Sequence, residues 1–355
     1  MDDEHASPVK NGSALKSLTF FNNKGGVGKT TLACNMASHL AKDLQLKVLF
    51  VDCDPQCNAT QLLLREDQWE DIYANRRDSL KRTVLKVLRH IRAGDSEIDD
   101  NLVIETSERF GIDVLPGHPT LSAAEDRLSA SWSDFIRGDV GGARRSLWAA
   151  SLVKAAKYYD LVVFDLGPSL GALNRSVLLG SDTFVTPTAA DLFSLYALDN
   201  IGDWVKSWTR DYNRGYSALH DQDEFDLSDI GLNESPRIAS GYLGYTVQQY
   251  VTKNTGGRLR SVNAYDRYRR QVPERAKSLA YMQFHSQIDL DLGLVPNMFS
   301  MVPLAQSAHS PIRELTIADG LRGAQVTQQK KYVERLSRIA TRLVENTGLV
   351  AHSHG

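Results

Sequence analysis

Short runs of apolar residues alternate along this chain with longer segments in which apolar residues recur every three to four positions. Three such runs occupy residues 15–21, 47–52 and 161–165. Uninterrupted apolar character over a few residues is typical of strands buried on both faces of a parallel sheet. After the first run, Leu32, Met36 and Leu40 repeat at helical spacing with alanines beside them, which predicts a helix packed closely on that sheet. Strand, helix and strand in this order predict a right-handed βαβ unit.

The end of the chain predicts an amphipathic helix over residues 326–344. One face of that helix carries Val333, Leu336, Ile339, Ala340 and Leu343. Strands of the buried type separated by such helices are typical of the α/β class. We therefore expect a mainly parallel, doubly wound sheet flanked by helices, with ligands bound beyond the carboxyl ends of its strands.

The spread of the motifs along the chain predicts one large domain. A length of 355 residues suggests about two average domains, but the segments described below run from Lys24 to about Ile312. We expect a single domain over residues 14–347, with helical and loop insertions at about 64–101 and 200–281. The termini, 1–13 and 348–355, are expected to be a disordered tail and a flexible tail.

Two features lie in the expected insertions. Residues 76–92 are expected to form a basic helix with an apolar stripe of Leu80, Val84, Val87 and Leu88. We favour a packed helix with a solvated basic face over a binding surface there. The second insertion holds an acidic loop at 220–229, a strand-like run at 241–251, and a stretch rich in arginine and tyrosine.

Composition fits a globular cytoplasmic enzyme. The chain is 42% apolar and 24% charged, with a net charge of −2, so no global charge directs it toward nucleic acid. The three cysteines, Cys34, Cys53 and Cys57, lack the spacing of a zinc site and are expected to be free thiols. No apolar stretch has the length of a membrane span, and we expect no membrane partner.

The sequence KGGVGKTT, Lys24 to Thr31, carries the most specific chemistry. It joins a predicted strand to a predicted helix, where the backbone N–H groups of a glycine-rich turn and the positive end of the helix form a cradle for phosphates. Lys29 is expected to reach the outer phosphates of a nucleotide, and the Thr30 hydroxyl to ligate Mg²⁺.

This loop resembles the "deviant Walker A" loop of the ParA and MinD family of P-loop ATPases. Asn23 stands where the ordinary P-loop has glycine, and the additional Lys24 lies just inside the loop. The resemblance implies a P-loop NTPase sheet, ATP and Mg²⁺ as cofactors, and a homodimer formed on ATP binding in which Lys24 reaches the partner's phosphates. On this resemblance the nucleotide contacts are Asn23, Lys24, Gly25, Gly26, Val27, Gly28, Lys29, Thr30 and Thr31.

Carboxylates follow the next two predicted strands. Asp52 to Thr60 resembles the family's DxDPQxNAT segment, which implies that Asp54 orients the attacking water and that Asp52 lies nearer the metal. Asp165 ends a Walker B pattern and is expected to hold Mg²⁺ through water. Cys57 stands where the family commonly has glycine, a change that could stiffen this switch loop.

The resemblance extends toward the C-terminus. Residues 295–315 are similar to the family's loop that lines the adenine pocket, which makes Pro296 a further nucleotide contact. His309 falls on the family's histidine, and we assign it no chemistry. The catalytic assignments are Lys24, Lys29 and Asp54, and the metal assignments are Thr30, Asp52 and Asp165.

Two functions from different classes fit these residues. In the first, a ParA-type partition or positioning ATPase dimerises with ATP, coats DNA without sequence preference, and is stimulated by a small ParB-like partner. In the second, a nucleotide-gated regulatory protein controls an effector without binding DNA. A MinD-like membrane switch is disfavoured because residues 348–355 are too short and polar for a membrane helix. An iron–sulfur reductase is disfavoured because no cysteine follows Cys57.

DNA binding would depend on a local patch. Between Lys253 and Lys277, basic residues outnumber acidic ones, and two tyrosines, Tyr265 and Tyr268, are interleaved. The expected DNA contacts are Arg258, Arg260, Arg267, Arg269 and Arg270. Arginine forks bind phosphates without reading sequence, whereas the alternative is a solvated arginine-rich helix partly neutralised by the acidic loop. Binding to DNA would place the protein on the nucleoid.

Overall fold

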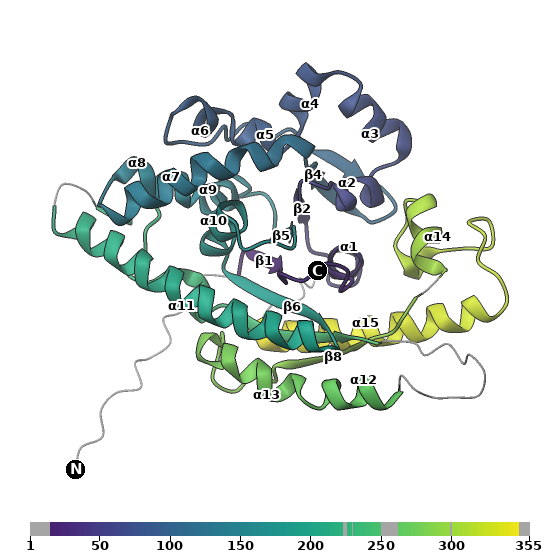
Figure 1. Cartoon of the computed structure of the whole chain (residues 1–355). Coiled ribbons are helices and arrows are strands. Elements are labelled where there is room, and N and C mark those ends of the chain that lie inside the picture. The colour runs from purple at the N-terminus through teal and green to yellow at the C-terminus, as the bar shows by residue number, and fades with distance from the viewer. Residues whose placement is uncertain (1–14, 223–225, 229, 250–261, 299, 348–355) are drawn as a thin grey trace, which may run out of the picture.

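The computed structural model describes residues 15–222, 226–228, 230–249, 262–298 and 300–347 (Figure 1). Eight strands form one sheet in the order β3-β4-β2-β5-β1-β6-β7-β8. Their bounds are β1 Ser17–Phe20, β2 Val48–Cys53, β3 Glu105–Ser107, β4 Ile112–Leu115, β5 Leu161–Leu166, β6 Thr183–Ala189, β7 Tyr242–Gln248 and β8 Asp291–Val295. Every neighbouring pair is parallel except β3 with β4. The mainly parallel, doubly wound sheet expected from the sequence is confirmed.

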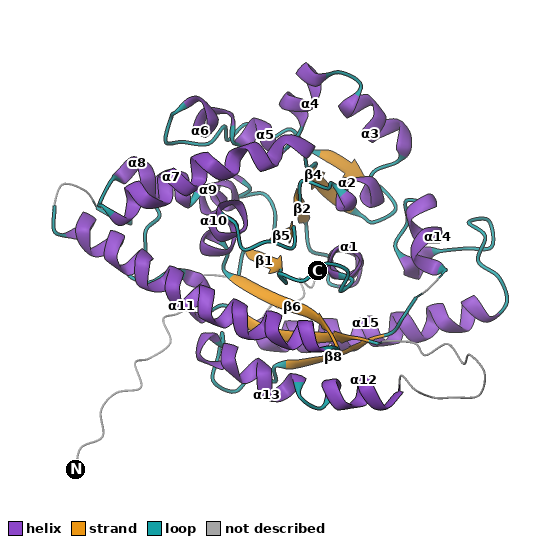
Figure 2. Ribbon diagram, in the orientation of Figure 1, coloured by secondary structure: helices purple, strands orange, loops and turns teal. Residues whose placement is uncertain are grey.

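Helices cover both faces of the sheet, and alternate residues of each strand point to opposite sides. In β2, Leu49 and Val51 belong to one buried apolar cluster, whereas Val48 and Phe50 belong to the other. Helices on the side of Val48 are α1 Lys29–Asp43, α2 Asn58–Leu63, α3 Glu66–Tyr73, α14 Met301–Ser307 and α15 Ala324–Thr347. Figure 2 shows the strands enclosed by helices in this way.

The other face carries more helices. They are α5 Val84–Val87, α6 Arg89–Ala93, α7 Glu125–Ile136, α8 Val140–Ser146, α9 Trp148–Ala155, α10 Ala172–Gly180, α11 Leu192–His220 and α13 Val272–Ala276. The remaining helices are α4 Arg76–Arg82 and α12 Val262–Arg269, and short 3-10 turns span Pro119–Ala124, Arg237–Ser240, Lys277–Met282 and Ile312–Glu314. The expected closing helix is α15, with Leu336, Ile339 and Leu343 buried.

The prediction of a single basic helix over residues 76–92 is wrong, because the segment forms three short helices, α4, α5 and α6. Thr83 is extended, with φ −128° and ψ 175°, and the following Val84 N–H donates to Pro116 O at 2.8 Å. A tertiary hydrogen bond thus replaces a helical one. The apolar stripe is nevertheless packed, since Val84, Val87 and Leu88 are buried and Leu80 is partly buried.

The strand-like run in the second expected insertion belongs to the central sheet. As β7 it lies between β6 and β8, with Thr186 beside Tyr245 and Thr246 beside Gly293. The inserted material is therefore confined to the segments on either side of β7. Part of the arginine-rich stretch, including Arg258 and Arg260, lies outside the described residues.

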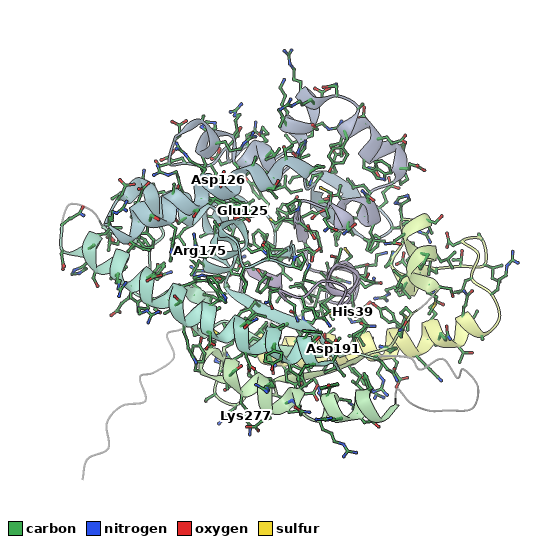
Figure 3. All side chains as sticks on the ribbon, in the orientation of Figure 1. His39, Glu125, Asp126, Arg175, Asp191 and Lys277 are labelled. Atoms are coloured by element: carbon green, nitrogen blue, oxygen red, sulfur yellow. The ribbon has the colours of Figure 1, made fainter. Side chains whose placement is uncertain are left out.

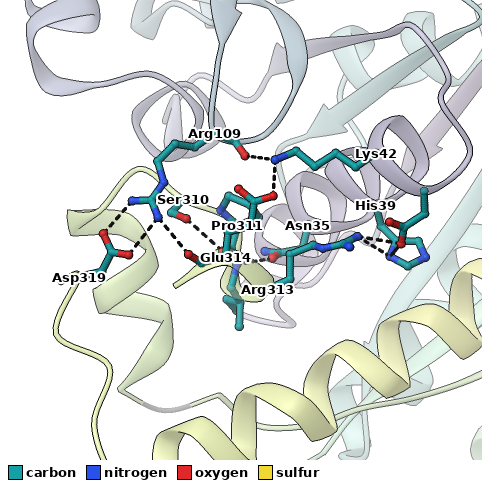
Figure 4. A network of polar contacts seen from close by, with 11 residues as sticks. Asn35, His39, Lys42, Arg109, Ser310, Pro311, Arg313, Glu314 and Asp319 are labelled. Atoms are coloured by element: carbon teal, nitrogen blue, oxygen red, sulfur yellow. Dashed lines mark hydrogen bonds and ion pairs between the residues drawn. The ribbon is translucent and has the colours of Figure 1, made fainter. Parts of the chain in front are cut away.

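A polar network ties the segment after α14 to α1 and to the turn before β4 (Figure 4). Arg109 donates to Asp319 at 2.8 and 3.0 Å and to Ala308 O at 3.1 Å. Lys42 of α1 pairs with Glu314, and its ammonium also donates to Arg109 O at 2.6 Å. These contacts fix residues 308–319 against the helix that begins in the nucleotide loop.

Candidate nucleotide-binding site

The glycine-rich loop runs from the end of β1 into α1. Gly26 and Gly28 both have φ +74°, a conformation that glycine adopts without the steric cost a side chain would impose. A Cβ atom on Gly28 would also lie 3.0 Å from Gln248 Oε1. Gly28 directly precedes α1, so the backbone of the loop meets the positive end of a 15-residue helix. This is the local geometry expected for a phosphate cradle.

Three polar side chains meet where β1 and β5 end. Lys29 Nζ lies 3.4 Å from Asp165 Oδ1, and the Thr30 hydroxyl donates to Asp165 Oδ2 at 2.7 Å. Both Lys29 and Asp165 are buried, and burial raises the pKa of Asp165 despite the neighbouring Lys29 charge. A hydroxyl and a carboxylate at this spacing suit Mg²⁺, which takes a few protein oxygens and completes its shell with water and phosphate.

Lys24 makes its contacts within the same chain. Its ammonium pairs with Asp191 and lies 3.2 Å from Ser194 Oγ. Asp191 follows β6 and caps α11, accepting from Ser194 N at 3.0 Å, and Figure 3 labels it at the start of that helix. Burial alone would raise the pKa of Asp191, but the hydrogen bond from Lys24 brings it below its usual value. An anion entering the loop would compete with Asp191 for this lysine.

Asp52 anchors the switch helix α2. Its Oδ2 accepts from Thr60 N at 2.8 Å and from the Thr60 hydroxyl at 2.6 Å, while Oδ1 accepts from Asp54 N at 3.1 Å. Gly117 closes over it, because a Cβ there would lie 2.9 Å from Asp52 Cγ. Burial, together with the charge of the neighbouring Asp165, raises the pKa of Asp52 to about 7. With three hydrogen bonds already made, Asp52 holds the loop in place and has little free capacity as a direct metal ligand.

Asp54 lies beside the loop that follows β5. Its Oδ1 accepts from Gln56 N at 2.9 Å, and a Cβ on Gly167 would be only 3.2 Å from that same oxygen. Glycine at 167 therefore leaves room for the Asp54 carboxylate. Among the described residues, none donates a hydrogen bond to the other oxygen of Asp54, which leaves an acceptor that could hold a water.

Cys57 occupies an unusual backbone position in the same loop. Its φ of 54° is in the left-handed region, which costs a residue with a side chain roughly 1–2 kcal/mol. The thiol is buried, and burial raises its pKa well above the usual value. Glycine adopts this conformation without that cost, so the strain at Cys57 is local to this loop.

The loop after β5 is held from the far side by α7. Glu125 Oε2 accepts from Leu173 N at 3.0 Å at the start of α10, and a Cβ on Gly171 would lie 2.6 Å from Glu125 Oε1. Nearby, Arg175 stacks on Trp132 at 4.7 Å, and burial lowers the pKa of Arg175 to about 10. Figure 3 labels Glu125 and Arg175 on neighbouring elements. A carboxylate at the N-terminus of a helix stabilises that helix.

The C-terminal candidate residues lie beyond β8. Gln248 Nε2 donates to Pro296 O at 3.4 Å, and the same side chain borders Gly28, so Pro296 is linked to the phosphate loop through one residue. His309 has φ 45° and bonds through Nδ1 to Gln61 O at 2.9 Å. His309 therefore contacts the backbone of α2.

The expected DNA contacts that the structure describes lie apart from this site. Arg267, Arg269 and Arg270 are exposed at the end of α12, and Arg267 lies over the Tyr268 ring at 5.9 Å. None of the three forms an ion pair with another described residue.

Three residues that shape the site were not predicted from the sequence: Asp191, Gly117 and Thr60. Asp191 had a readable signal, since it is a carboxylate that follows a strand by two residues and directly precedes a helix. Thr60 was the last residue of the segment that resembles the family's DxDPQxNAT motif, although no role was assigned to it. Gly117 had no such signal, because its importance arises from its close approach to Asp52 from the end of the neighbouring strand β4.

Comparison with known proteins agrees with this geometry. The sequence profile of the AAA domain family matches residues 15–217, more than half of the chain. The sporulation initiation inhibitor protein Soj of Bacillus subtilis is 31% identical over 191 residues, which cover 54% of this chain and 65% of Soj. This chain is a member of the ParA/MinD family of P-loop ATPases.

Two solved structures are also similar to this ParA/MinD-family protein. The crystal structure of protein DIP2308 from Corynebacterium diphtheriae is 35% identical, with a TM-score of 0.74 over 94% of this chain and 98% of that one. An ATP complex of a McdA variant from Cyanothece shares the fold, with a TM-score of 0.59 and 16% identity over 97% of this chain and 100% of that one. The chain spans 54–65% of the length of the first curated relatives it matches. Within the described residues, no helix is both long and apolar enough to cross a bilayer.

Proposed function

We propose that this protein is an ATP-dependent, dimerising switch of the ParA type, which hydrolyses ATP to ADP and phosphate. The observation that carries the proposal is the meeting of Lys29, Thr30 and Asp165 at the end of a glycine-rich loop, with Asp54 beside them. Lys29 and the loop backbone would hold the phosphates, Thr30 and Asp165 would hold Mg²⁺, and Asp54 would orient water. Bound Mg²⁺ would neutralise charge on the phosphates.

Dimerisation is supported by the surface beside Lys24. The first turn of α11 exposes Leu192, Phe193 and Tyr196, with Phe193 72% accessible. The same turn carries Ser194, which contacts Lys24. Large apolar side chains gathered at one exposed place are typical of interaction surfaces. We infer that a second copy covers this turn when ATP draws Lys24 away from Asp191 and toward the partner's phosphates.

The cellular role that we propose is partition or intracellular positioning, with the ATP-bound dimer on DNA and a small ParB-like protein as activator. Arg267, Arg269 and Arg270 support it, because these exposed arginines pair with no carboxylate in the part of the chain that the structure describes and are available to phosphates. A dimer would present two such patches, and the protein would then be nucleoid-associated in the cytoplasm.

A regulatory switch without DNA is the second candidate. Two observations favour it: the net charge of −2, and the pairing of the next cations along the chain, Arg275 with Asp199 and Lys277 with Glu274. In this case the same dimer would gate an effector protein. The ATPase chemistry is common to both candidates.

The proposal is tested by sedimentation of Lys24→Ala with Mg²⁺ and ATP. We expect Lys24→Ala to bind ATP within about threefold of wild type, because its charge faces the partner, yet to remain monomeric. Asp54→Ala, which should trap the ATP dimer, is the positive control, and Lys331→Ala, on the exposed face of α15, is the matched lysine control. If Lys24→Ala dimerises as completely as Asp54→Ala, the proposed role of Lys24 across the dimer is wrong.

A further inference from the structure

A pocket lies at the end of the sheet opposite the nucleotide loop. It is lined by Lys16 just before β1, Val162 at the start of β5, and Gly180 just before β6. These positions are the amino ends of parallel strands, whereas the phosphate loop follows the carboxyl end of β1. The volume of the pocket is about 380 Å³, within the range of sites that bind small organic molecules.

The floor of the pocket is apolar and fixed. Leu147, Val162 and Leu179 line it and are nearly inaccessible, with Val162 2% exposed. Tyr212 contributes its ring, and its hydroxyl is already bonded to Asn233 O at 2.9 Å. An apolar group entering this space would be removed from water on several sides.

Several cations line the described part of the rim. Four cations, Lys16, Lys154, Lys157 and Arg237, line the pocket, and no aspartate or glutamate is among the described residues that line it. Arg237 pairs with Asp182, and Lys157 lies over the Tyr158 ring. Neither Lys16 nor Lys154 forms an ion pair with any residue that the structure describes. Elsewhere the concave surfaces are mixed, as around Asp134 and Arg145.

We propose that this pocket binds a small amphiphilic anion, with an aliphatic body and one carboxylate-like head group. The tail would occupy the apolar floor, where burial removes its methylene groups from water, and the head group would lie among the lysines of the rim. An uncharged ligand would form no ion pair with the lysines of the rim. A small anion without a tail would leave the apolar floor exposed to water. The site does not depend on the ATPase proposal, since it shares no residue with the nucleotide loop.

Calorimetric titration of the full-length protein with three ligands tests both halves of the ligand. Octanoate carries tail and head group, octan-1-ol carries the tail alone, and acetate carries the head group alone. We expect octanoate to bind at least about tenfold more tightly than either, because a hydrogen bond to a charged group contributes about 1.5–3 kcal/mol.

Variants then locate the binding. Replacing Lys154 and Lys157 together by Glu should weaken octanoate about tenfold or more and leave octan-1-ol unchanged, whereas Val153→Trp should fill the pocket and abolish both. The control of equal charge replaces Lys330 and Lys331, at exposed positions of α15, by Glu. It should change neither the affinity for octanoate nor that for octan-1-ol. Circular dichroism and the midpoint of thermal unfolding, measured for every variant, establish that each has folded.

Two results would overturn the proposal. Equal affinities for octanoate and octan-1-ol would show that the lysines do not contribute. Octanoate binding that survives Val153→Trp in a folded protein would show that the ligand lies elsewhere.

Discussion

The nucleotide loop and the arginine-bearing end of α12 both present positive charge, but in opposite settings. Lys29 is buried against Asp165, and Lys24 is held by Asp191. Arg267 and Arg269 extend into solvent. In the loop, each lysine is held in one place by one carboxylate, which a bound phosphate would replace as its partner. Single substitutions there should therefore have large effects. On α12 the charges act as a sum and are screened by salt, so effects there should be smaller and graded.

The largest effect is expected from Lys29→Ala. This change removes the cation that faces the outer phosphates and leaves the Asp165 carboxylate buried without its partner, at a cost of about 3–5 kcal/mol for a broken buried pair. We expect the affinity for ATP, measured by titration with a fluorescent analogue, to fall by about 100-fold or more. Lys331→Ala is the control. If Lys29→Ala binds ATP within twofold of wild type, the assignment of Lys29 to the outer phosphates is wrong.

Asp54→Ala should separate hydrolysis from binding. It removes the acceptor that we assign to the attacking water and leaves the phosphate cradle intact, so steady-state ATP hydrolysis should fall by about 100-fold while ATP affinity changes little. Gly167→Ala is a graded companion, because its Cβ would press on the same carboxylate from 3.2 Å, and we expect a smaller loss. Hydrolysis at the wild-type rate in Asp54→Ala contradicts the assignment.

The arginines of α12 should behave as a group. With Arg267, Arg269 and Arg270 replaced by Glu, retention on nonspecific duplex DNA in the presence of ATP should weaken. The log–log salt dependence should become shallower by about 0.9 for each phosphate that the variant no longer neutralises. ATP-driven dimerisation should be unchanged. The control changes Lys330, Lys331 and Arg335 of α15 to Glu.

A wild-type ATP-bound dimer with no affinity for duplex DNA at low salt would contradict the DNA-binding role and favour the regulatory one. Equal reductions in DNA retention by the α12 and α15 variants would show that only total charge matters.

The smallest effect is expected from breaking the partly exposed ion pair between Arg109 and Asp319, which should change only the free energy of unfolding. Hydrogen bonds from Arg109 and Thr316 hold the pKa of Asp319 well below its usual range. A lowered folded-state pKa contributes stability that is present above about pH 4 and is lost as the pH falls further. Asp319→Asn should therefore cost about 1–2 kcal/mol in urea unfolding at pH 7, and the difference from wild type should shrink below pH 4. A difference independent of pH would contradict the ion-pair origin.

Much of the fold could be predicted because its determinants are local. The apolar runs of β1, β2 and β5 and the glycine turn each lie within about ten residues of sequence, and their order fixes the βαβ handedness. The break at Thr83 could not be predicted, because it depends on a bond to Pro116 on another segment. The place of β7 in the sheet likewise depends on pairing with β6 and β8.

The candidate site divides in the same way. Lys29, Thr30 and Asp165 could be found because a strand end or a glycine loop marks each of them in the sequence. Asp52 shows the limit, since its position in the motif suggested a place near the metal but not its contacts. It lies beside Asp165 on the neighbouring strand, and the hydrogen bonds that it accepts from Thr60 and Asp54 hold the loop. Which of two neighbouring aspartates is free depends on folded contacts.

The two edges of the sheet restrict how copies of this protein can assemble. At one edge, β3 is only three residues long, and Glu105 there pairs with Arg82. At the other edge, Arg342 of α15 donates to the backbone oxygen of Asp291, and Gly293 N–H donates to the Asp291 side chain at 3.0 Å. Edges that are short, charged or occupied by side chains resist strand-to-strand addition. Joining of two copies into one continuous sheet is therefore disfavoured at both edges, so any assembly of copies has to use other surfaces.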